Sequence, residues 1–309
     1  MDILFWRQTI VRKYYQNYTL EANRCYFNNC FSISTAWQSY YNDKLIEGYS
    51  LITLKAYQVQ SNLLIKHFGD IAIDQITNDG LKQYLAKVGE TLKPASLAHR
   101  VRFIKSLFRW AHEEGKIHRN PFSKLKEPKS GIRVPKFLTE KEIEHLREAC
   151  QTAKEHAIIE FMYSSGCRIG EIVLINRKDI NWSNNSVVVR GKGDKESEVY
   201  FNIRSEIWLN RYLNERQDED AALFVTERAP HRLSIAQTRY IIKNVSLRSE
   251  FNKEISPHQL RHSYATHLID NGAPLEVIQS LLGHEKSKTT RIDAVLSGKQ
   301  RHEHYSKYF

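Results

Sequence analysis

Four short stretches in the C-terminal half of this 309-residue chain carry side chains that can bind anions or move protons. Arg168 follows a glycine and a cysteine in SSGCRIGE, and Lys192 follows a run of valines in VVVRGKGDKE. His258 and Arg261 stand three residues apart in HQLRH, a spacing that places both on one helical face. His284 comes directly after a glycine that we expect to end a helix.

Taken together, these side chains fit chemistry on a phosphodiester. Two arginines can hold one phosphate through paired hydrogen bonds and stabilise the extra charge of a pentavalent transition state. A histidine can accept a proton or bind a non-bridging oxygen, and a lysine on a hairpin can protonate the leaving oxygen. No carboxylate cluster suited to Mg²⁺ accompanies them in the sequence, so we predict phosphoryl transfer without a metal or another cofactor.

Helices and one hairpin are expected to position this chemistry. The β-rich runs at 187–190 and 198–201 flank a polar, glycine-containing turn, which predicts a β-hairpin with Lys192 near its tip. Helical patterns follow in WLNRYLNER, SPHQLRHSYATHLIDNG and APLEVIQSLLGH. Thr139 with Glu142 three residues later is the pattern of a capping box, so a helix should begin there.

The N-terminal part, from residue 33 to about 121, reads as helical throughout. Leu51, Leu54, Tyr57, Leu64 and Phe68 are spaced to line one helical face. Gly69 is expected to end that helix, and Thr77 to begin the next. The stretch SLAHRVRFIKSLFRWAHEEG has an apolar stripe with four basic residues mostly off it: Arg100, Arg102, Lys105 and Arg109. A basic helix face is usually only solvated, but here it is a candidate for lying on a DNA backbone.

These patterns predict a mainly α fold with a small antiparallel β region, an α+β class with two domains. The proline- and lysine-containing stretch KLKEPKSGIRVPK, which ends at Lys136, is typical of a linker, and Lys136 is a further candidate DNA contact. We predict an N-terminal extension of undetermined role, a helical DNA-binding domain, the linker and a C-terminal catalytic-type domain, at 1–31, 32–127, 128–136 and 137–309.

Composition favours a polyanionic partner. The net charge is +11, which suits phosphates, although a basic protein without a nucleic-acid role would show it too. No apolar run spans a bilayer and no signal peptide is apparent, so we expect a cytoplasmic protein that does not enter membranes. The four cysteines lack C-x-x-C spacing and read as reduced thiols. His258, His262 and His267 lack the H-E-x-x-H pattern of zinc sites, so no metal is expected.

The order SSGCRIGE, VRGKGDKE, HQLRHSYATHLIDNG and IQSLLGHEKSKTT resembles the tyrosine recombinase family (phage integrase, Xer-like) over about residues 32–309. The resemblance implies a two-domain, C-shaped clamp around double-stranded DNA, without a cofactor, that acts as a tetramer on paired sites. Arg168 and Arg261 resemble its phosphate-binding arginines and Lys192 its leaving-group acid. His258 and His284 resemble the remaining hydrogen-bonding and acid–base positions. Glu171 resembles the acidic residue that supports the site.

The chain departs from the family at the nucleophile. Nine residues after His284 the family has a tyrosine in a phrase resembling T-T-x-x-Y, and this chain has Asp293. A phenol can reach the phosphorus and form a phosphotyrosine, whereas a carboxylate is shorter and already anionic. Tyr305 and Tyr308 lie twelve and fifteen residues further on. The tail that contains them resembles the segment that docks on a neighbouring subunit, so self-association through it is expected.

Three hypotheses remain. The leading one is a sequence-specific DNA-binding protein that has lost the nucleophile and does not cleave, either a regulator such as a repressor or a non-cleaving partner in recombination. The alternative is an active recombinase or integrase of a phage or transposon, with a substituted nucleophile or another residue in that role. The third is a basic helical protein without a nucleic-acid role. For the first two we expect association with the bacterial nucleoid.

Overall fold

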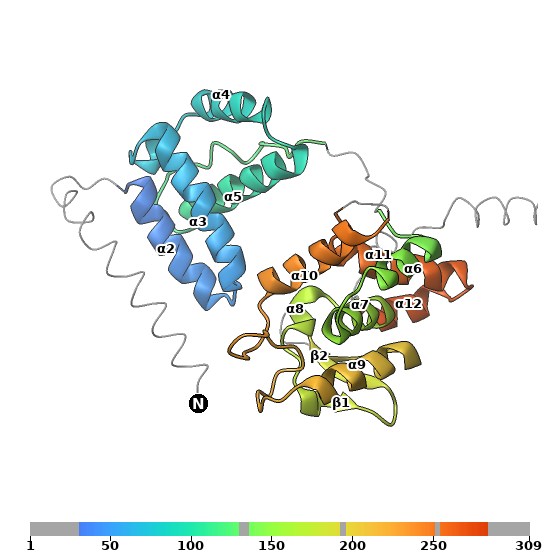
Figure 1. The fold of residues 1–309 in the computed structure, drawn as a ribbon. Coiled ribbons are helices and arrows are strands. Elements are labelled where there is room, and N and C mark those ends of the chain that lie inside the picture. The colour runs from blue at the N-terminus through green and yellow to red at the C-terminus, as the bar shows by residue number, and fades with distance from the viewer. Residues whose placement is uncertain (1–30, 130–135, 192–195, 251–253, 284–309) are drawn as a thin grey trace, which may run out of the picture. The chain divides into compact units, whose positions relative to one another are not determined.

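The computed structural model describes residues 31–129, 136–191, 196–250 and 254–283. The chain divides into two compact units between Ile132 and Arg133, and each unit has its own hydrophobic core. Within the described residues the fold is mainly helical with one small antiparallel sheet, which confirms the predicted α+β class (Figure 1).

The described residues of unit 1 form four helices and one 3₁₀ turn. The elements are α2 (Ile33–Ile46), α3 (Leu51–Phe68), the turn Ile73–Gln75, α4 (Asn78–Gly89) and α5 (Pro94–Glu113). Hydroxyls of Ser32, Ser50 and Thr77 accept hydrogen bonds from the first turns of α2, α3 and α4, so side chains cap three of the four helices. The predictions of Thr77 as a cap and of Gly69 as the end of α3 are confirmed.

Aromatic side chains form the centre of unit 1. The Tyr40 ring packs edge-on against Trp110 and Phe103, with ring centroids 5.6 Å and 6.5 Å away. Its hydroxyl pairs with Ser106 at 2.8 Å, and burial raises the pKa of Tyr40 well above its usual value. Trp110 donates its indole N–H to Asp43 at 2.6 Å. The buried aromatic surface and the hydrogen bonds of the Tyr40 hydroxyl and the Trp110 indole N–H together hold α2 against α5.

The segment after α5 folds back on that helix. Phe122 is buried edge-on against Phe108, with ring centroids 4.4 Å apart, and Leu125 packs on the same core. Glu127 accepts a hydrogen bond from Arg102 at 3.1 Å. The chain is therefore tied to unit 1 as far as residue 127.

Unit 2 contains seven helices, a 3₁₀ turn at Arg177–Asp179 and three strands among its described residues. The helices are α6 (Glu140–Glu148), α7 (Ala153–Ser165), α8 (Ile169–Ile172), α9 (Ile203–Glu215), α10 (Ile235–Arg248), α11 (Pro257–Asp270) and α12 (Leu275–Leu281). The capping box of Thr139 and Glu142 at the start of α6 is present as predicted.

The sheet is antiparallel, in the order β1 (Ile180–Asn181), β2 (Ser186–Arg190), β3 (Glu196–Tyr200). Val187 pairs with Val199, and Arg190 pairs with Glu196. The predicted hairpin is confirmed, although β3 begins and ends earlier than the 198–201 run. Strand β1 was not predicted, because two residues carry no readable alternation.

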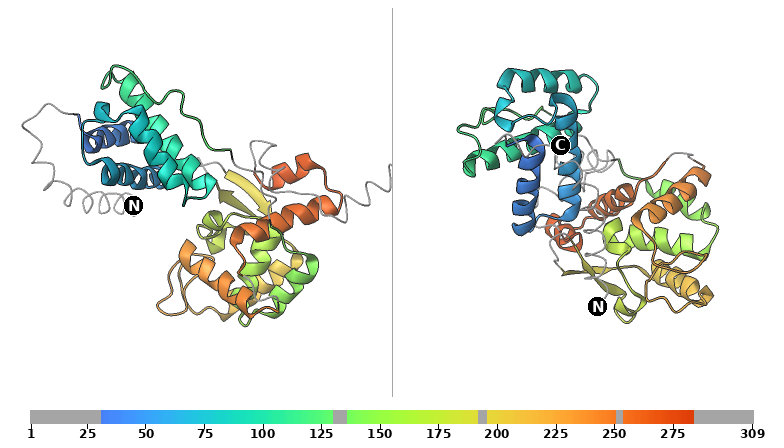
Figure 2. Two further views of the ribbon diagram at one scale, coloured as in Figure 1. Left: turned by 90° about the horizontal axis from the view of Figure 1, so that it is seen from above. Right: turned by 90° about the vertical axis from the view of Figure 1, so that its left-hand side faces the viewer.

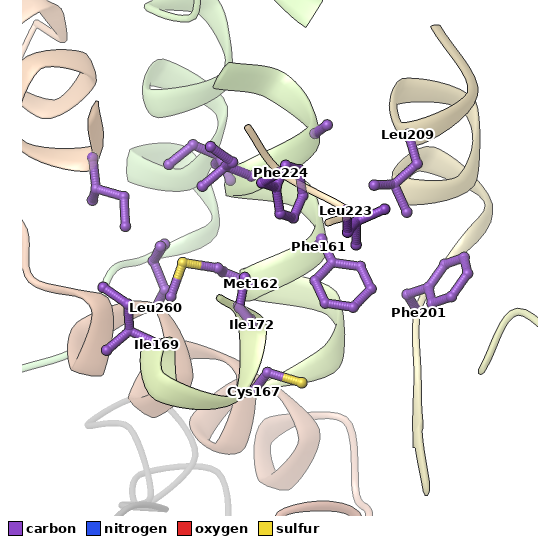
Figure 3. Close-up of a cluster of buried hydrophobic side chains, with 14 of the residues drawn as sticks. Phe161, Met162, Cys167, Ile169, Ile172, Phe201, Leu209, Leu223, Phe224 and Leu260 are labelled. Atoms are coloured by element: carbon purple, nitrogen blue, oxygen red, sulfur yellow. The ribbon is translucent and has the colours of Figure 1, made fainter. Parts of the chain in front are cut away.

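Phe161 lies at the centre of unit 2 (Figure 3). Its ring is fully buried on α7 and lies 5.5 Å from the Phe201 ring and 6.4 Å from the Phe224 ring. Leu209 of α9 and Leu260 of α11 belong to the same buried cluster. Segments far apart in sequence thus share one core, and α7 is its central helix.

One predicted core face was partly wrong. Leu54 and Leu64 of α3 are buried, but Leu51 in the same apolar series is 48% exposed. Leu51 is the first residue of α3, and the adjacent Ile52 is also exposed.

We expect Phe161→Ala to lower the free energy of unfolding of unit 2 by about 3–5 kcal/mol, the usual cost of removing a fully buried ring. Val188→Ala is the control, because Val188 is 51% exposed and its truncation should change stability by only about 0.5 kcal/mol. Urea denaturation of the full chain measures both. Similar effects of the two substitutions would contradict the central role of Phe161.

Candidate functional site

The turn between α7 and α8 is the structural base of the site. Gly166 ends α7 with φ of +62°, in the left-handed region that favours glycine. A Cβ at this position would lie 2.5 Å from a ring carbon of Tyr264 on α11. Gly166 therefore serves two purposes: it reverses the chain and it lets α11 approach closely.

Arg261 of α11 ties this turn to the end of α12. Its side chain is buried, and its guanidinium donates to the Gly166 carbonyl at 2.5 Å and to the Leu282 carbonyl at 2.8 Å. Three segments thus meet on one cation: the end of α7, the middle of α11 and the end of α12. The sequence did not reveal the parts played by Tyr264 and Leu282, because a ring contact and a main-chain carbonyl leave no residue-type signal.

Arg168 lies on the same turn but faces solvent. It is the N-cap of α8, its side chain is 37% exposed, and it donates to the Glu171 carboxylate at 2.7 Å. The same carboxylate accepts the Arg168 backbone N–H at 2.8 Å and is itself buried. Glu171 therefore orients the Arg168 guanidinium from below, as a predicted supporting acid should. The structure brings both predicted arginines to the Gly166 turn.

His258 lies in the first turn of α11, one helical turn before Arg261. Its side chain is exposed, and its ring centroid lies 6.5 Å from that of His262. The N-terminal end of a 14-residue helix carries a partial positive charge, which favours an anion near His258. His258 is thus accessible to a ligand at the N-terminal end of α11, the helix that also carries Arg261.

The end of α12 lies beside the hairpin, and Figure 2 shows both from two further sides. A Cβ at Gly283 would lie 3.3 Å from the Ser197 hydroxyl of β3. Lys192, His284 and Asp293 lie outside the described residues, so their predicted roles stay predictions. The described chain that follows Lys192 and the described chain just before His284 meet at this contact.

Two side chains at the site could be mistaken for substitute nucleophiles. Burial raises the pKa of the Cys167 thiol to about 12, and burial raises the pKa of the Tyr264 phenol to about 12. Both groups are therefore neutral at physiological pH. Cys167 is also only 1% exposed, which removes it from reach of a ligand.

The four basic residues predicted on α5 do not share one face. Arg102, Lys105 and Arg109 are spaced by three and four residues and follow one side of the helix. Arg100 lies about 200° around the helix from Arg102. Its guanidinium donates to Gln60 at 3.0 Å and lies 5.6 Å from the Tyr84 ring centroid. Arg100 thus packs between helices of unit 1, and only the other three form a basic stripe. Lys136, the predicted contact in the linker, is exposed.

No group of three histidine, cysteine, aspartate or glutamate side chains that could hold a metal occurs among the residues described. The His267 ring hydrogen-bonds Tyr163, and the His258 ring lies near the His262 ring. Within the same described residues, no helix is long and apolar enough to cross a membrane.

Comparison with known proteins identifies the family. Residues 136–294 match the phage integrase family, and residues 38–115 match the phage integrase N-terminal SAM-like domain. Tyrosine recombinase XerC of Proteus mirabilis is 30% identical over 254 residues, which cover 79% of this chain and 83% of that protein. Tyrosine recombinase XerD of Ralstonia nicotianae is 34% identical over 262 residues, which cover 80% and 85%.

Solved structures share the fold. A lambda integrase dimer bound to a COC' core site superposes with a TM-score of 0.73 at 18% identity, covering 87% of this chain and 78% of that one. XerH recombinase bound to palindromic difH substrate gives a TM-score of 0.69 at 23% identity, covering 84% and 80%. The fold of this chain, which is mainly helical with one small sheet, is thus that of the tyrosine recombinases. The chain belongs to the phage integrase family of tyrosine recombinases.

We expect Gly166→Ala to lower the free energy of unfolding of unit 2 by more than the cost of placing an alanine in the left-handed backbone region. Gly272→Ala is the matched control, because Gly272 also lies in unit 2, has φ of +84° and has nothing within 4 Å of a new Cβ. The control should lose about 1–2 kcal/mol, and Gly166→Ala about 1–3 kcal/mol more because its Cβ overlaps with Tyr264. Chemical denaturation compares them, and equal losses would show that the contact with Tyr264 yields easily.

Proposed function

We propose that this protein binds double-stranded DNA through a tyrosine recombinase scaffold and does not cleave it. The observation that carries the proposal is the convergence of Arg168 and Arg261 on the Gly166 turn, with Asp293 at the position of the nucleophile. The biological role that follows is that of a sequence-specific regulator or of a non-cleaving partner in recombination.

Phosphate binding is supported by the way the two arginines are held. Arg168 is exposed and oriented by the buried Glu171, so its guanidinium is ready to receive an anion without first being ordered. Exposed His258 adds a hydrogen-bonding group at the start of α11, the helix that also carries Arg261. By family resemblance, Lys192 and His284 complete the contacts with the same phosphate.

Loss of cleavage is supported by the chemistry of Asp293. An ionised carboxylate approaching a phosphodiester meets a like charge, which opposes attack, and its side chain is shorter than a tyrosine. The carboxylate would also attract Arg168 or Arg261 and neutralise the positive charge of that arginine, whereas an uncharged phenol would leave the charge in place. Binding does not require the nucleophile, because the basic groups that hold the backbone are separate residues.

The basic stripe of unit 1 supports a second region of DNA contact. Arg102 and Arg109 are exposed on one side of α5, and Lys105 lies between them. In the proposal, residues 32–127 and residues 137–309 both contact the duplex, and a linker at 128–136 connects them. The tail after Asp293 would join one copy to the next, and the nucleoid is the expected location.

One observation favours a second candidate, an active recombinase of a phage or transposon. The Arg168–Glu171 pair and the buried Arg261 are intact, and the curated relatives cited above are named tyrosine recombinases. In that case Tyr305, Tyr308 or a residue of another subunit would supply the nucleophile.

A covalent trap distinguishes the two candidates. The preferred site is first selected from random duplexes with the full chain, and then offered as a nicked substrate whose cleaved end diffuses away. We expect no covalent protein–DNA adduct on a denaturing gel with the natural sequence. Asp293→Tyr should form one, because a phenol then stands beside an intact pair of arginines.

Two controls accompany that experiment. Asp293→Phe supplies a ring without a hydroxyl and should form no adduct, and the same holds for Asp293→Tyr combined with Arg168→Ala. An adduct with the natural sequence would overturn the proposal in favour of the recombinase, and mapping the modified residue would identify the nucleophile.

We expect the triple substitution Arg102→Gln, Lys105→Gln, Arg109→Gln to weaken DNA binding and its salt dependence. Each lost phosphate contact should reduce the slope of log K against log salt by about 0.9. Arg100→Gln is the control and should leave the slope unchanged, because Arg100 bonds Gln60 inside unit 1. Fluorescence anisotropy at several salt concentrations measures the slopes, and an equal loss with Arg100→Gln would contradict the stripe.

A further inference from the structure

Two polar residues of the motif RHSYATH have no part in the site described above. Ser263 and His267 lie one helical turn apart on α11, and both are buried. They face residues 136–139, which we call the exit segment because they lead from the linker into α6. The described structure shows what each of them bonds there.

Ser263 fixes the main chain of the exit segment. Its hydroxyl accepts the Leu138 backbone N–H at 2.7 Å and donates to the Gln259 carbonyl, also at 2.7 Å. The bond from Leu138 is buried and the bond to Gln259 is partly buried, and the Leu138 side chain is fully buried in the core of unit 2. An alanine at position 263 would leave the Leu138 N–H without an acceptor away from water, which is costly.

His267 fixes the same segment one turn further on. Its Nδ1 lies 2.6 Å from the Tyr163 hydroxyl, and its imidazole ring contacts the exit segment at Phe137. The Phe137 ring stands edge-on to it, with centroids 6.4 Å apart. Burial lowers the pKa of His267, and burial raises that of Tyr163 to about 12. At neutral pH both groups are therefore uncharged, and the tautomer of His267 decides which of the two donates.

Contacts at Arg261 and at His267 thus hold both ends of the short stretch of α11 between these two residues. His267 joins it to Tyr163 of α7 and to the exit segment, while Arg261 joins it to Gly166 at the end of α7 and to Leu282. Since six residues of helix span only about 9 Å, a shift at one end cannot be absorbed before the other.

We propose that Ser263 and His267 are positioning residues that clamp the exit segment to α11 and thereby set the position of Arg261. Loosening the clamp moves the arginine away from the Gly166 and Leu282 carbonyls, although neither residue contacts a phosphate. Helix α11 then forms a rigid connection between the exit segment, where the linker enters unit 2, and the proposed phosphate site. The part of the inference that concerns DNA rests on the proposed function.

Hydrogen exchange of the full chain, followed by mass spectrometry, tests the clamp without DNA. Ser263→Ala should speed exchange about tenfold in residues 136–139 and also in 258–262 and 166–169. Ser246→Ala is the matched control: Ser246 is equally buried on α10, accepts the Ile255 N–H at 3.2 Å and donates to the Lys243 carbonyl at 2.8 Å. Its effect should stay near residue 255. Faster exchange confined to 136–139 in Ser263→Ala would overturn the inference.

Substitutions of His267 test its bond to Tyr163. An asparagine amide reaches the place of Nδ1 and keeps the Tyr163 contact, whereas a leucine side chain of similar size cannot hydrogen-bond. The clamp predicts that His267→Asn leaves exchange at 258–262 close to that of the natural protein and that His267→Leu speeds it. Equal behaviour of the two variants, or the opposite order, would contradict the clamp.

DNA affinity gives the functional readout. With the selected duplex, Ser263→Ala should raise the dissociation constant several-fold more than Ser246→Ala, with an unchanged salt slope and an unchanged amount of DNA bound at saturation. Mere unfolding would instead lower the saturating amount. Equal constants for the two variants would refute the clamp while leaving DNA binding intact. If the natural protein binds no duplex, the proposed function fails and the exchange experiment still decides the clamp.

Discussion

The buried guanidinium of Arg261 is the constraint on which the rest of unit 2 depends. A cation removed from water is tolerated only where hydrogen bonds replace its hydration. Here two main-chain carbonyls do so, one at Gly166 and one at Leu282. Each of those carbonyls is available because a helix has ended there, so α7 and α12 must stop where they do. Gly166 must also be a glycine, because the helix that carries Arg261 approaches too closely for a Cβ.

Local patterns in the sequence predicted much of this arrangement, because caps, turns and apolar stripes act over only a few residues. Thr77, Gly69 and the box of Thr139 with Glu142 fell where expected, and the motif order located both arginines. The partners of Arg261 could not be predicted, since any residue has a carbonyl and the contact spans 95 positions. The position of Arg100 was missed for a related reason. Its charge indicates a partner, and only packing shows that the partner is Gln60.

The residues that order the site are distinct from the residue that would perform the covalent step. Glu171 holds Arg168, and the carbonyls of Gly166 and Leu282 hold Arg261, all without position 293. These hydrogen bonds come from Glu171 and from main-chain carbonyls, so residue 293 does not supply them. In the proposed function, phosphate binding relies on the two arginines and cleavage relies on residue 293, so one can be lost without the other.

Helix α11 explains why binding and architecture are hard to separate in this protein. Along four turns it presents His258 to solvent, buries Arg261 between two helix ends, and fixes the exit segment through Ser263 and His267. A rigid helix transmits displacement along its axis, because each of its residues is bonded to the turn before. Any force on the chain entering unit 2 at Leu138 therefore acts on the same helix that carries Arg261. In the proposed function, this coupling connects the point at which the linker enters unit 2 to an arginine proposed to bind phosphate.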